Sequence, residues 1–362
     1  METCPRCGRA LVGRPQRCEQ IIEEIVPARP HVTRVITYQG DCPVCGAVES
    51  RHRLQTSHGP GAAKVQLGPR ALAMAACLNK QHGLSMGKRC RVLKDLTGLS
   101  VSRGGVSHAL MRMAGKMQDR YKTLIQRVRA SPATFADETR GWVGGAGGWL
   151  WVFTTAQETV YHVDRSRGSA VVSEILGEDY PGMLVSDCLS SYAPADDRKH
   201  KCIAHHLRAI KKAGKLPGCA DSAYLRQWRL LFIGVLAAYK LWAKVSAEQF
   251  VTMRARLSAW RDRLLETSCS LRGDVRIRNR LRKQRAHLLG CLYDRSAEPT
   301  NNRAERALRP AVIARKVSCG NRTERGKTCW QILASLAATC WQNSINFVAY
   351  LAQRLPLTAA PG

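Results

Sequence analysis

The chain has 362 residues, enough for two or three domains, and its hydrophobic fraction of 45% allows a packed core and excludes wholesale disorder. The 57 lysine and arginine residues outnumber the 27 aspartate and glutamate residues, which gives a formal net charge of +30. Such a surplus predicts a polyanionic partner, and nucleic acid is the first candidate. A ribosome-associated or membrane-surface protein is the alternative.

Most of the 15 cysteines are scattered singly through apolar segments. This distribution predicts reduced core thiols in a cytoplasmic protein rather than a disulfide framework. The start of the chain is polar, so we expect no signal peptide. The longest apolar run, residues 230–239, is followed by Lys240 and is too short to span a bilayer, so we expect no membrane segment.

Residues 1–55 contain two C-P-x-C-G motifs, each predicting a tight turn whose glycine lets backbone amides point at the thiolates. The four cysteines of these motifs are Cys4, Cys7, Cys42 and Cys45. Four thiolates are the ligand set of a structural zinc site, so we predict a zinc ribbon that binds one Zn²⁺. Alternating apolar residues at 21–25 and 32–38 predict short strands between the motifs.

A linker is expected at residues 55–63, followed by a helix over 68–83. Residues 88–96 and 101–113 then have the pattern of a helix-turn-helix, with Ser102 as N-cap of the second helix and Arg103 facing outward. Such a unit can place its second helix in a DNA groove, and a plain helical hairpin is the equal alternative. The helical, basic pattern continues over residues 111–129.

From residue 131 the pattern changes to that of a mixed sheet. The expected elements are strands at 134–142, 149–153 and 159–163, a helix at 168–176, and a strand at 183–187. The first and fourth strands carry Asp137 and Asp187. Residues 207–294 have only helical patterns, so we expect a helical insertion there, with further helices at 328–339 and 347–351.

Between the insertion and these last helices lies a short helix predicted to begin at Asn301 or Asn302 and to end at Pro310. It carries Glu305, for which two interpretations are open. Glu305 forms an i,i+4 ion pair with Arg309 on a solvated face, or it is a metal-ligating carboxylate beside a phosphate-binding surface.

The acids Asp137, Asp187 and Glu305 together form the pattern of a phosphoryl-transfer site. Carboxylates from separate elements can hold two divalent ions roughly 4 Å apart, and hard oxygen ligands suit Mg²⁺ or Mn²⁺. We therefore expect two such ions in the active assembly. Glu138 is excluded as a ligand because neighbouring strand residues point to opposite faces.

The chain resembles the insertion-sequence-66 family of bacterial transposases. The match rests on Asp137-Glu138-Thr139, Trp149-Leu150-Trp151-Val152, Ser166-Arg167-Gly168, Val185-Ser186-Asp187, Cys202-x-x-His205, Asn301-Asn302-x-Ala304-Glu305-Arg306-Ala307-Leu308-Arg309-Pro310, Arg315-Lys316 and Ala349-Tyr350-Leu351. The resemblance covers nearly the whole chain. It implies an α/β fold with a ribonuclease-H-like mixed-sheet catalytic core and an all-helical insertion, preceded by the zinc ribbon and a helical, helix-turn-helix-like domain.

The resemblance implies that Asp137, Asp187 and Glu305 are the catalytic triad. The expected domains are a zinc ribbon at 1–55, a DNA-binding region at 64–130, the first part of the core at 131–206, the insertion at 207–295, and the rest of the core with the C-terminal helices at 296–362. For Cys202 and His205, a structural anchor is favoured over a second metal site. Members usually begin with a helical, leucine-rich segment ahead of the ribbon, and here the ribbon starts at Cys4.

The resemblance also implies the chemistry. A transposase of a bacterial insertion sequence would bind the terminal inverted repeats, hydrolyse a phosphodiester at the element end, and transfer the exposed 3′-hydroxyl to target DNA. Candidate DNA contacts are Arg103, Arg303, Arg306, Arg309, Arg315 and Lys316. The expected partners are a second copy on DNA and accessory proteins of the same element, in the bacterial cytoplasm at the nucleoid. The alternatives are an inactive or domesticated DNA-binding regulator and another ribonuclease-H-like nuclease.

Overall fold

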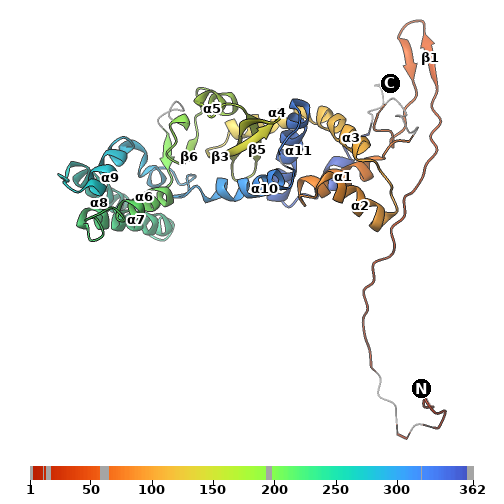
Figure 1. The fold of residues 1–362 in the computed structure, drawn as a ribbon, viewed down its shortest axis with the longest axis horizontal. Helices are drawn as coiled ribbons and strands as arrows, with labels where there is room; N and C mark the ends of the chain where they lie inside the picture. Colours follow the sequence, from red (N-terminus) through yellow and green to blue (C-terminus); the bar gives the residue numbers. More distant parts are fainter. Residues whose placement is uncertain are drawn as a thin grey trace.

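The computed structural model describes residues 3–10, 12–13, 18–57, 65–192, 198–318 and 320–356. Its body is elongated, with a central sheet between two groups of helices (Figure 1). The linker expected at 55–63 lies mostly in the segment 58–64, outside the described residues. Within the described residues, no helix is long and apolar enough to cross a membrane.

The central sheet has five strands in the order β5-β4-β3-β6-β7. The strands are β3 (Ala133–Val143), β4 (Ala146–Thr154), β5 (Thr159–Asp164), β6 (Met183–Ser186) and β7 (Lys199–Lys201). Strand β4 is antiparallel to both neighbours, whereas β6 is parallel to β3 and to β7. The expected mixed α/β architecture is therefore confirmed.

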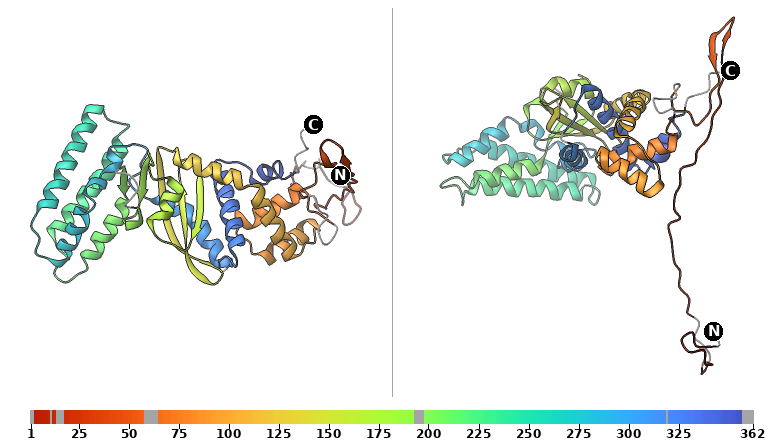
Figure 2. Two further views of the ribbon diagram at one scale, coloured as in Figure 1. Left: turned by 90° about the horizontal axis from the view of Figure 1, so that it is seen from above. Right: turned by 45° about the vertical axis from the view of Figure 1, so that its right-hand side comes forward.

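Helices cover both faces of this sheet. The helices ahead of it are α1 (Pro69–Lys80), α2 (Met86–Thr97), α3 (Arg103–Lys116) and α4 (Gln118–Arg129); α5 (Ser169–Leu176) follows β5. After β7 come α6 (Ile203–Ala213), α7 (Ala223–Leu241), α8 (Ala247–Glu266), α9 (Arg272–Arg282), α10 (Asn302–Ser318), α11 (Glu324–Gln342) and α12 (Phe347–Ala352). Helices α6–α9 form one end of the body and α1–α3 the other (Figure 2).

The two faces of the sheet bury separate hydrophobic cores because strand side chains alternate in direction. Trp151 and Phe153 pack into a core with α1–α5, α11 and α12, whereas Val152 and Tyr161 pack into a core with α6–α10. The helices of residues 207–294 thus pack into the second core around Trp228, which is fully buried. Helix α3 packs into the first core, and Ser102 caps its exposed start as expected by accepting a hydrogen bond from the Gly105 amide.

The strands predicted at residues 21–25 and 32–38 are wrong. Residues 18–38 have no regular structure, and Ile21 and Val32 are almost fully exposed. Alternating apolar residues form a strand only where a partner strand and a core are available, and neither lies beside this segment. The small hairpin lies instead around the second cysteine motif, with strands β1 (Gln39–Cys42) and β2 (Gly46–Glu49).

One helix break and one strand also differ from prediction. The helical pattern over 111–129 is interrupted at Met117, where α3 ends and α4 begins. Strand β7 was not predicted, because its sequence Lys199-His200-Lys201 is polar although all three residues are buried. Its strand conformation comes from pairing with β6, and the register joins His200 to Val185.

Pro310 does not end its helix, which corrects the predicted boundary. Helix α10 continues to Ser318 with Pro310 inside it. A proline in a helix interior costs about 3 kcal/mol, because it removes a hydrogen bond and crowds the preceding turn. Tertiary packing offsets that cost here: Ala311 is buried, and Arg315 donates hydrogen bonds to Thr139 Oγ1 and to the Arg140 carbonyl on β3.

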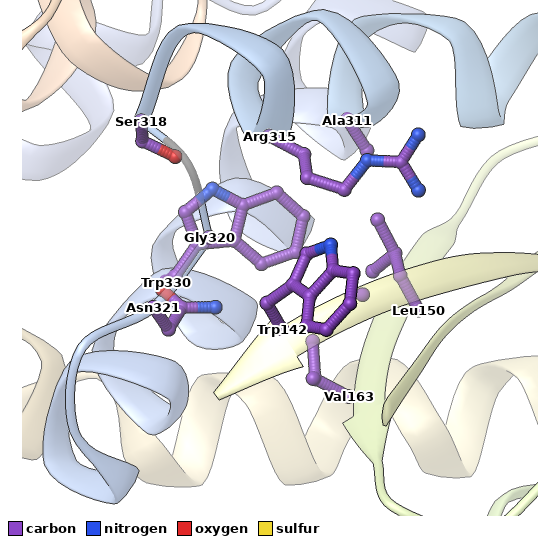
Figure 3. Close-up of a pocket in the computed structure, with 10 residues that line it drawn as sticks. Trp142, Leu150, Val163, Ala311, Arg315, Ser318, Gly320, Asn321 and Trp330 are labelled. Atoms are coloured by element: carbon purple, nitrogen blue, oxygen red, sulfur yellow. The ribbon is translucent and has the colours of Figure 1, made fainter. Parts of the chain in front are cut away.

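Figure 3 shows this second half of α10 against the sheet, with Ala311 and Arg315 above Trp142 and Leu150. Between them is a cavity of about 20 Å³, which Trp330 of α11 also lines. A cavity of that size holds about one water molecule. It is therefore a packing defect and is too small to admit a substrate.

Candidate active site

Asp137 and Asp187 lie side by side on one face of the sheet. The parallel register of β3 and β6 pairs Phe135 with Val185; Asp137 lies two residues further along β3, and Asp187 lies two residues further along the chain, just past the end of β6. Equal offsets put both side chains on the same face, about one strand spacing apart. Asp187 follows the last residue of β6, so the strand holds it from its end.

Glu305 reaches this pair from α10. Its helix begins beside β3, because the Asn301 side chain donates a hydrogen bond of 2.8 Å from Nδ2 to the Ala136 carbonyl, next to Asp137. Asn301 is fully buried, and its side chain therefore fixes α10 on the sheet instead of capping the helix as expected. Burial, followed by the charges of Glu138, Asp187 and Glu305, raises the pKa of Asp137 to about 7.

Cys202 joins the backbone segments that carry Asp187 and Glu305. Its amide donates to the Ser186 carbonyl at 3.0 Å, directly before Asp187. Its thiol Sγ accepts a hydrogen bond of 3.1 Å from the Asn301 amide at the start of α10. The thiol is buried, and burial raises its pKa. These contacts agree with an anchoring role for Cys202, which stays a prediction.

His205 and Arg208 follow Cys202 on α6 and face the acids. The guanidinium Nη2 of Arg208 lies 3.0 Å from Glu305 Oε1 and 3.0 Å from Nε2 of His205. Arg309 was the expected partner of Glu305, but the ion pair is formed by Arg208, which belongs to another helix. Exposed pairs of this kind contribute about 0–1 kcal/mol, which a divalent ion can readily displace. Burial, then the charge of Arg208, lowers the pKa of His205.

Lys201 is a site residue that the sequence did not reveal. It lies on β7, and its ammonium donates a 2.9 Å hydrogen bond to Ser186 Oγ beside Asp187. Burial lowers its pKa to about 8, although the neighbouring Cys188 and Asp187 oppose the shift. No local signal in the sequence identifies it, because the tripeptide Lys199-His200-Lys201 is polar and is buried only through its pairing with β6.

Glu138 points away from the three acids, as predicted. Its carboxylate accepts hydrogen bonds from Arg167 Nη2 at 2.7 Å and from the Tyr192 hydroxyl at 2.6 Å. The Glu138 side chain is almost fully buried. Glu138 therefore braces β3 against the loops on the opposite face, and its negative charge contributes to the raised pKa of Asp137.

The raised pKa predicts a pH-dependent stability for the metal-free protein. A carboxyl whose pKa is higher in the folded state than in the unfolded state binds more protons when folded, so stability falls as pH rises from about 4 to about 7. We expect Asp137→Asn to remove this loss. In EDTA, its Tm should exceed that of the wild type at pH 8 by about 2 °C or more, and the difference should narrow at pH 5.

Thermal melts at the two pH values test this, with Asp179→Asn as the matched control because Asp179 is an exposed turn residue. If Asp137→Asn raised the Tm by the same amount at pH 5 and at pH 8, the electrostatic explanation would be contradicted.

The basic residues predicted to contact DNA divide into two groups. Arg303 is held by Glu298 at 3.0 Å and lies over the Phe135 ring, and Arg315 is bound to β3. The remaining candidates are exposed: Arg103, Arg306, Arg309 and Lys316. Three of these four lie on α10 with Glu305, so free positive charge accompanies the acids.

The two cysteine motifs have the local geometry of zinc-binding turns but lie apart. Backbone amides lower the pKa of Cys4, chiefly that of Arg6, and the pKa of Cys42, chiefly that of Cys45. Amides that point at a thiolate suit a zinc ligand. The second motif lies in the β1–β2 hairpin, far from the N-terminal motif (Figure 1). The four thiols therefore do not converge in this structure.

Comparison with known proteins places these features in a family. A family model described as "Transposase IS66 family" matches residues 64–328, most of the chain. The chain is also similar to the protein "Uncharacterized protein y4qI" of Sinorhizobium fredii (strain NBRC 101917 / NGR234), at 27% identity over 321 residues. That match covers 79% of this chain, and the chain spans 58% of the relative's length. The chain belongs to the IS66 family of transposases.

Proposed function

We propose that the protein is a DNA transposase of a bacterial insertion sequence that cleaves element ends and joins them to target DNA. The observation that carries this proposal is the gathering of Asp137, Asp187 and Glu305, from two strands and a helix, beside exposed arginines. A mixed sheet with helices on both faces supports a ribonuclease-H-like catalytic core. Family membership supports transposition as the reaction.

The three carboxylates are hard oxygen ligands whose mutual repulsion suits a pair of divalent ions. Mg²⁺ or Mn²⁺, when bound there, would supply an activated water or 3′-hydroxyl and stabilise the leaving oxygen. For this, Arg208 must release Glu305, and Asp137 must be ionised. Lys201 lies over the Tyr192 ring on the face of Glu138, and its positive charge there would offset part of the repulsion among the acids.

The parts outside the site are proposed to recognise the element ends. Helices α2 and α3 supply the helix-turn-helix-like unit, with Arg103 at the exposed start of α3. The thiols of Cys4, Cys7, Cys42 and Cys45 would hold Zn²⁺ once the two turns approach, which makes the ribbon a module ordered by metal. A multimer that pairs two ends, with accessory proteins of the element, would be the active form.

The test is cleavage and strand transfer of duplexes that carry the element's terminal inverted repeats, in Mg²⁺ and in EDTA. The proposal expects metal-dependent nicks at the end and joining of pre-cut ends to plasmid. Binding of the same duplexes without any cleavage would instead favour a DNA-binding regulator. Cleavage of RNA–DNA hybrids without strand transfer would favour another nuclease.

The exposed basic residues on α10 predict how binding depends on salt. Each phosphate contact contributes about 0.9 to the slope of log Kobs against log salt concentration. The triple variant Arg306→Gln, Arg309→Gln, Lys316→Gln should therefore reduce the slope by up to about 2.7. This slope is measured by fluorescence anisotropy with labelled DNA over a series of salt concentrations.

The control for this experiment is a triple variant on the exposed side of α7, with the same change in charge. It is Arg226→Gln, Arg229→Gln, Lys240→Gln, which lies in the helical insertion. Equal reductions in the two triple variants would mean that net charge, and not the α10 surface, determines binding.

A further inference from the structure

A second cluster of potential ligands lies on the opposite face of the sheet from Asp137. The cross-strand register runs from Glu138 through Trp151 to His162, so the His162 side chain shares the face of Glu138. His162 lies on β5, the edge strand, and is joined there by Asp164 and by Glu174 of α5. One nitrogen and two carboxylate oxygens of these residues lie within 4.8 Å of one another.

The imidazole is the decisive feature of this cluster. His162 is only 8% exposed, and its Nε2 is buried without a hydrogen-bond partner. That nitrogen lies 4.0 Å from Asp164 Oδ2 and 3.8 Å from Glu174 Oε2, too far for a hydrogen bond and aimed between the two oxygens. A buried polar atom without a partner destabilises the fold, so this position of Nε2 between two carboxylates suits a bound ion.

The surroundings hold the Asp164 carboxylate and the backbone that carries Glu174. The Ser166 amide binds Asp164 Oδ1 at 2.6 Å, which leaves Oδ2 turned to the imidazole. Arg129 of α4 donates to the carbonyls of Ile175 and Glu174, at 2.9 and 2.6 Å, and so fixes the end of α5. Burial lowers the pKa of His162, and the charges of Glu174 and Asp164 oppose this shift.

We propose that His162, Asp164 and Glu174 bind a divalent transition-metal ion, Zn²⁺ foremost, at a site separate from the three acids and from the cysteine motifs. Tetrahedral Zn²⁺ with ligands at about 2.0–2.2 Å requires ligand atoms about 3.4 Å apart, so each oxygen must approach the imidazole nitrogen by about half an ångström. An imidazole with two carboxylates suits Zn²⁺ better than Mg²⁺. The bound ion links α5 to the edge strand and leaves the fourth position to water, since the Glu174 side chain is 60% exposed.

The experiment uses the full chain with the other metal sites removed: Cys4→Ser, Cys7→Ser, Cys42→Ser, Cys45→Ser and Asp187→Asn. Titration calorimetry with Zn²⁺ should find one ion per chain, and Co²⁺ should give visible bands without thiolate charge transfer. Zn²⁺ at about 100 times its Kd should raise the Tm by about 5 °C. In the same background, His162→Asn should weaken binding at least about 100-fold and abolish the rise in Tm.

Glu174→Gln is the second variant, because its exposed side chain is not needed for folding, and it should weaken Zn²⁺ binding about 10-fold or more. Asp179→Asn, at an exposed turn, is the matched control and should bind as the background does. A background protein that binds no Zn²⁺, or a Glu174→Gln variant that binds it unchanged, would overturn the proposal.

Discussion

Substitution of Asp187 by alanine is expected to reduce cleavage and strand transfer by at least about 10³-fold. Bound metal ions stabilise the charge of a phosphoryl-transfer transition state by several kcal/mol, and each 1.36 kcal/mol is a factor of ten in rate. Asp187 lies beside Asp137 at the end of β6, with its Oδ1 accepting the Leu189 amide at 2.8 Å. Removing it deprives the site of one of three acids while β6 keeps its pairing.

The measurement is a gel assay with end-bearing duplexes in Mg²⁺ and in Mn²⁺, together with binding by anisotropy. Binding of Asp187→Ala should stay within about threefold of the wild type, because the acid opposes rather than assists contact with phosphate. Asp179→Asn should retain full activity. An active Asp187→Ala protein would remove Asp187 from the proposed triad and leave the function to be assigned elsewhere.

Substitution of Asn301 by alanine is expected to reduce cleavage about 100-fold although Asn301 is not itself a metal ligand. Its side chain ties α10 to the Ala136 carbonyl, and its amide contacts Cys202, which in turn binds the Ser186 carbonyl. One residue thus joins the segments that carry Asp137, Asp187 and Glu305. Misplacement of a catalytic group by about 1 Å can cost about 10²-fold in rate.

Asn302→Ala is the matched control, because Asn302 is the exposed neighbour and undergoes the same chemical change. Asn301→Ala should also lower the free energy of unfolding by about 1–3 kcal/mol, since the Ala136 carbonyl loses its buried donor. As a positioning residue, Asn301 should shift the Mg²⁺ concentration needed for half-maximal activity, whereas loss of stability alone would not. Equal activity of the two alanine variants would exclude this role.

The elements of the central sheet were largely predictable from the sequence. The alternating and continuous apolar runs at β3, β4, β5 and β6 predicted strands near their observed bounds, and the hydrophobic periodicity of α7 predicted a helix. These are local signals, since each depends on a few consecutive residues. The strands predicted between the cysteine motifs failed for the complementary reason, because nothing in the fold pairs with them.

Pro310 and β7 show where local reasoning stops. A proline predicts the end of a helix, and three polar residues predict a turn, unless distant parts of the chain supply compensating contacts. For α10 these contacts come from β3 through Arg315, and for β7 they come from β6 and from the Pro299 carbonyl, which lies 3.0 Å from His200 Nε2. The contacts of Arg315 with β3 and of His200 with Pro299 join residues about 100 or more apart in sequence, and no short window contains them.

The sequence by itself determined the family resemblance, the candidate acids Asp137, Asp187 and Glu305, and the strongly basic charge, because these depend only on residue type and order. Tertiary structure decided what surrounds the acids. It made Arg208 rather than Arg309 the partner of Glu305, buried Lys201 beside Asp187, and directed His162 towards Asp164 and Glu174. Side-chain partners across a sheet depend on register and on helix docking, which are properties of the whole fold.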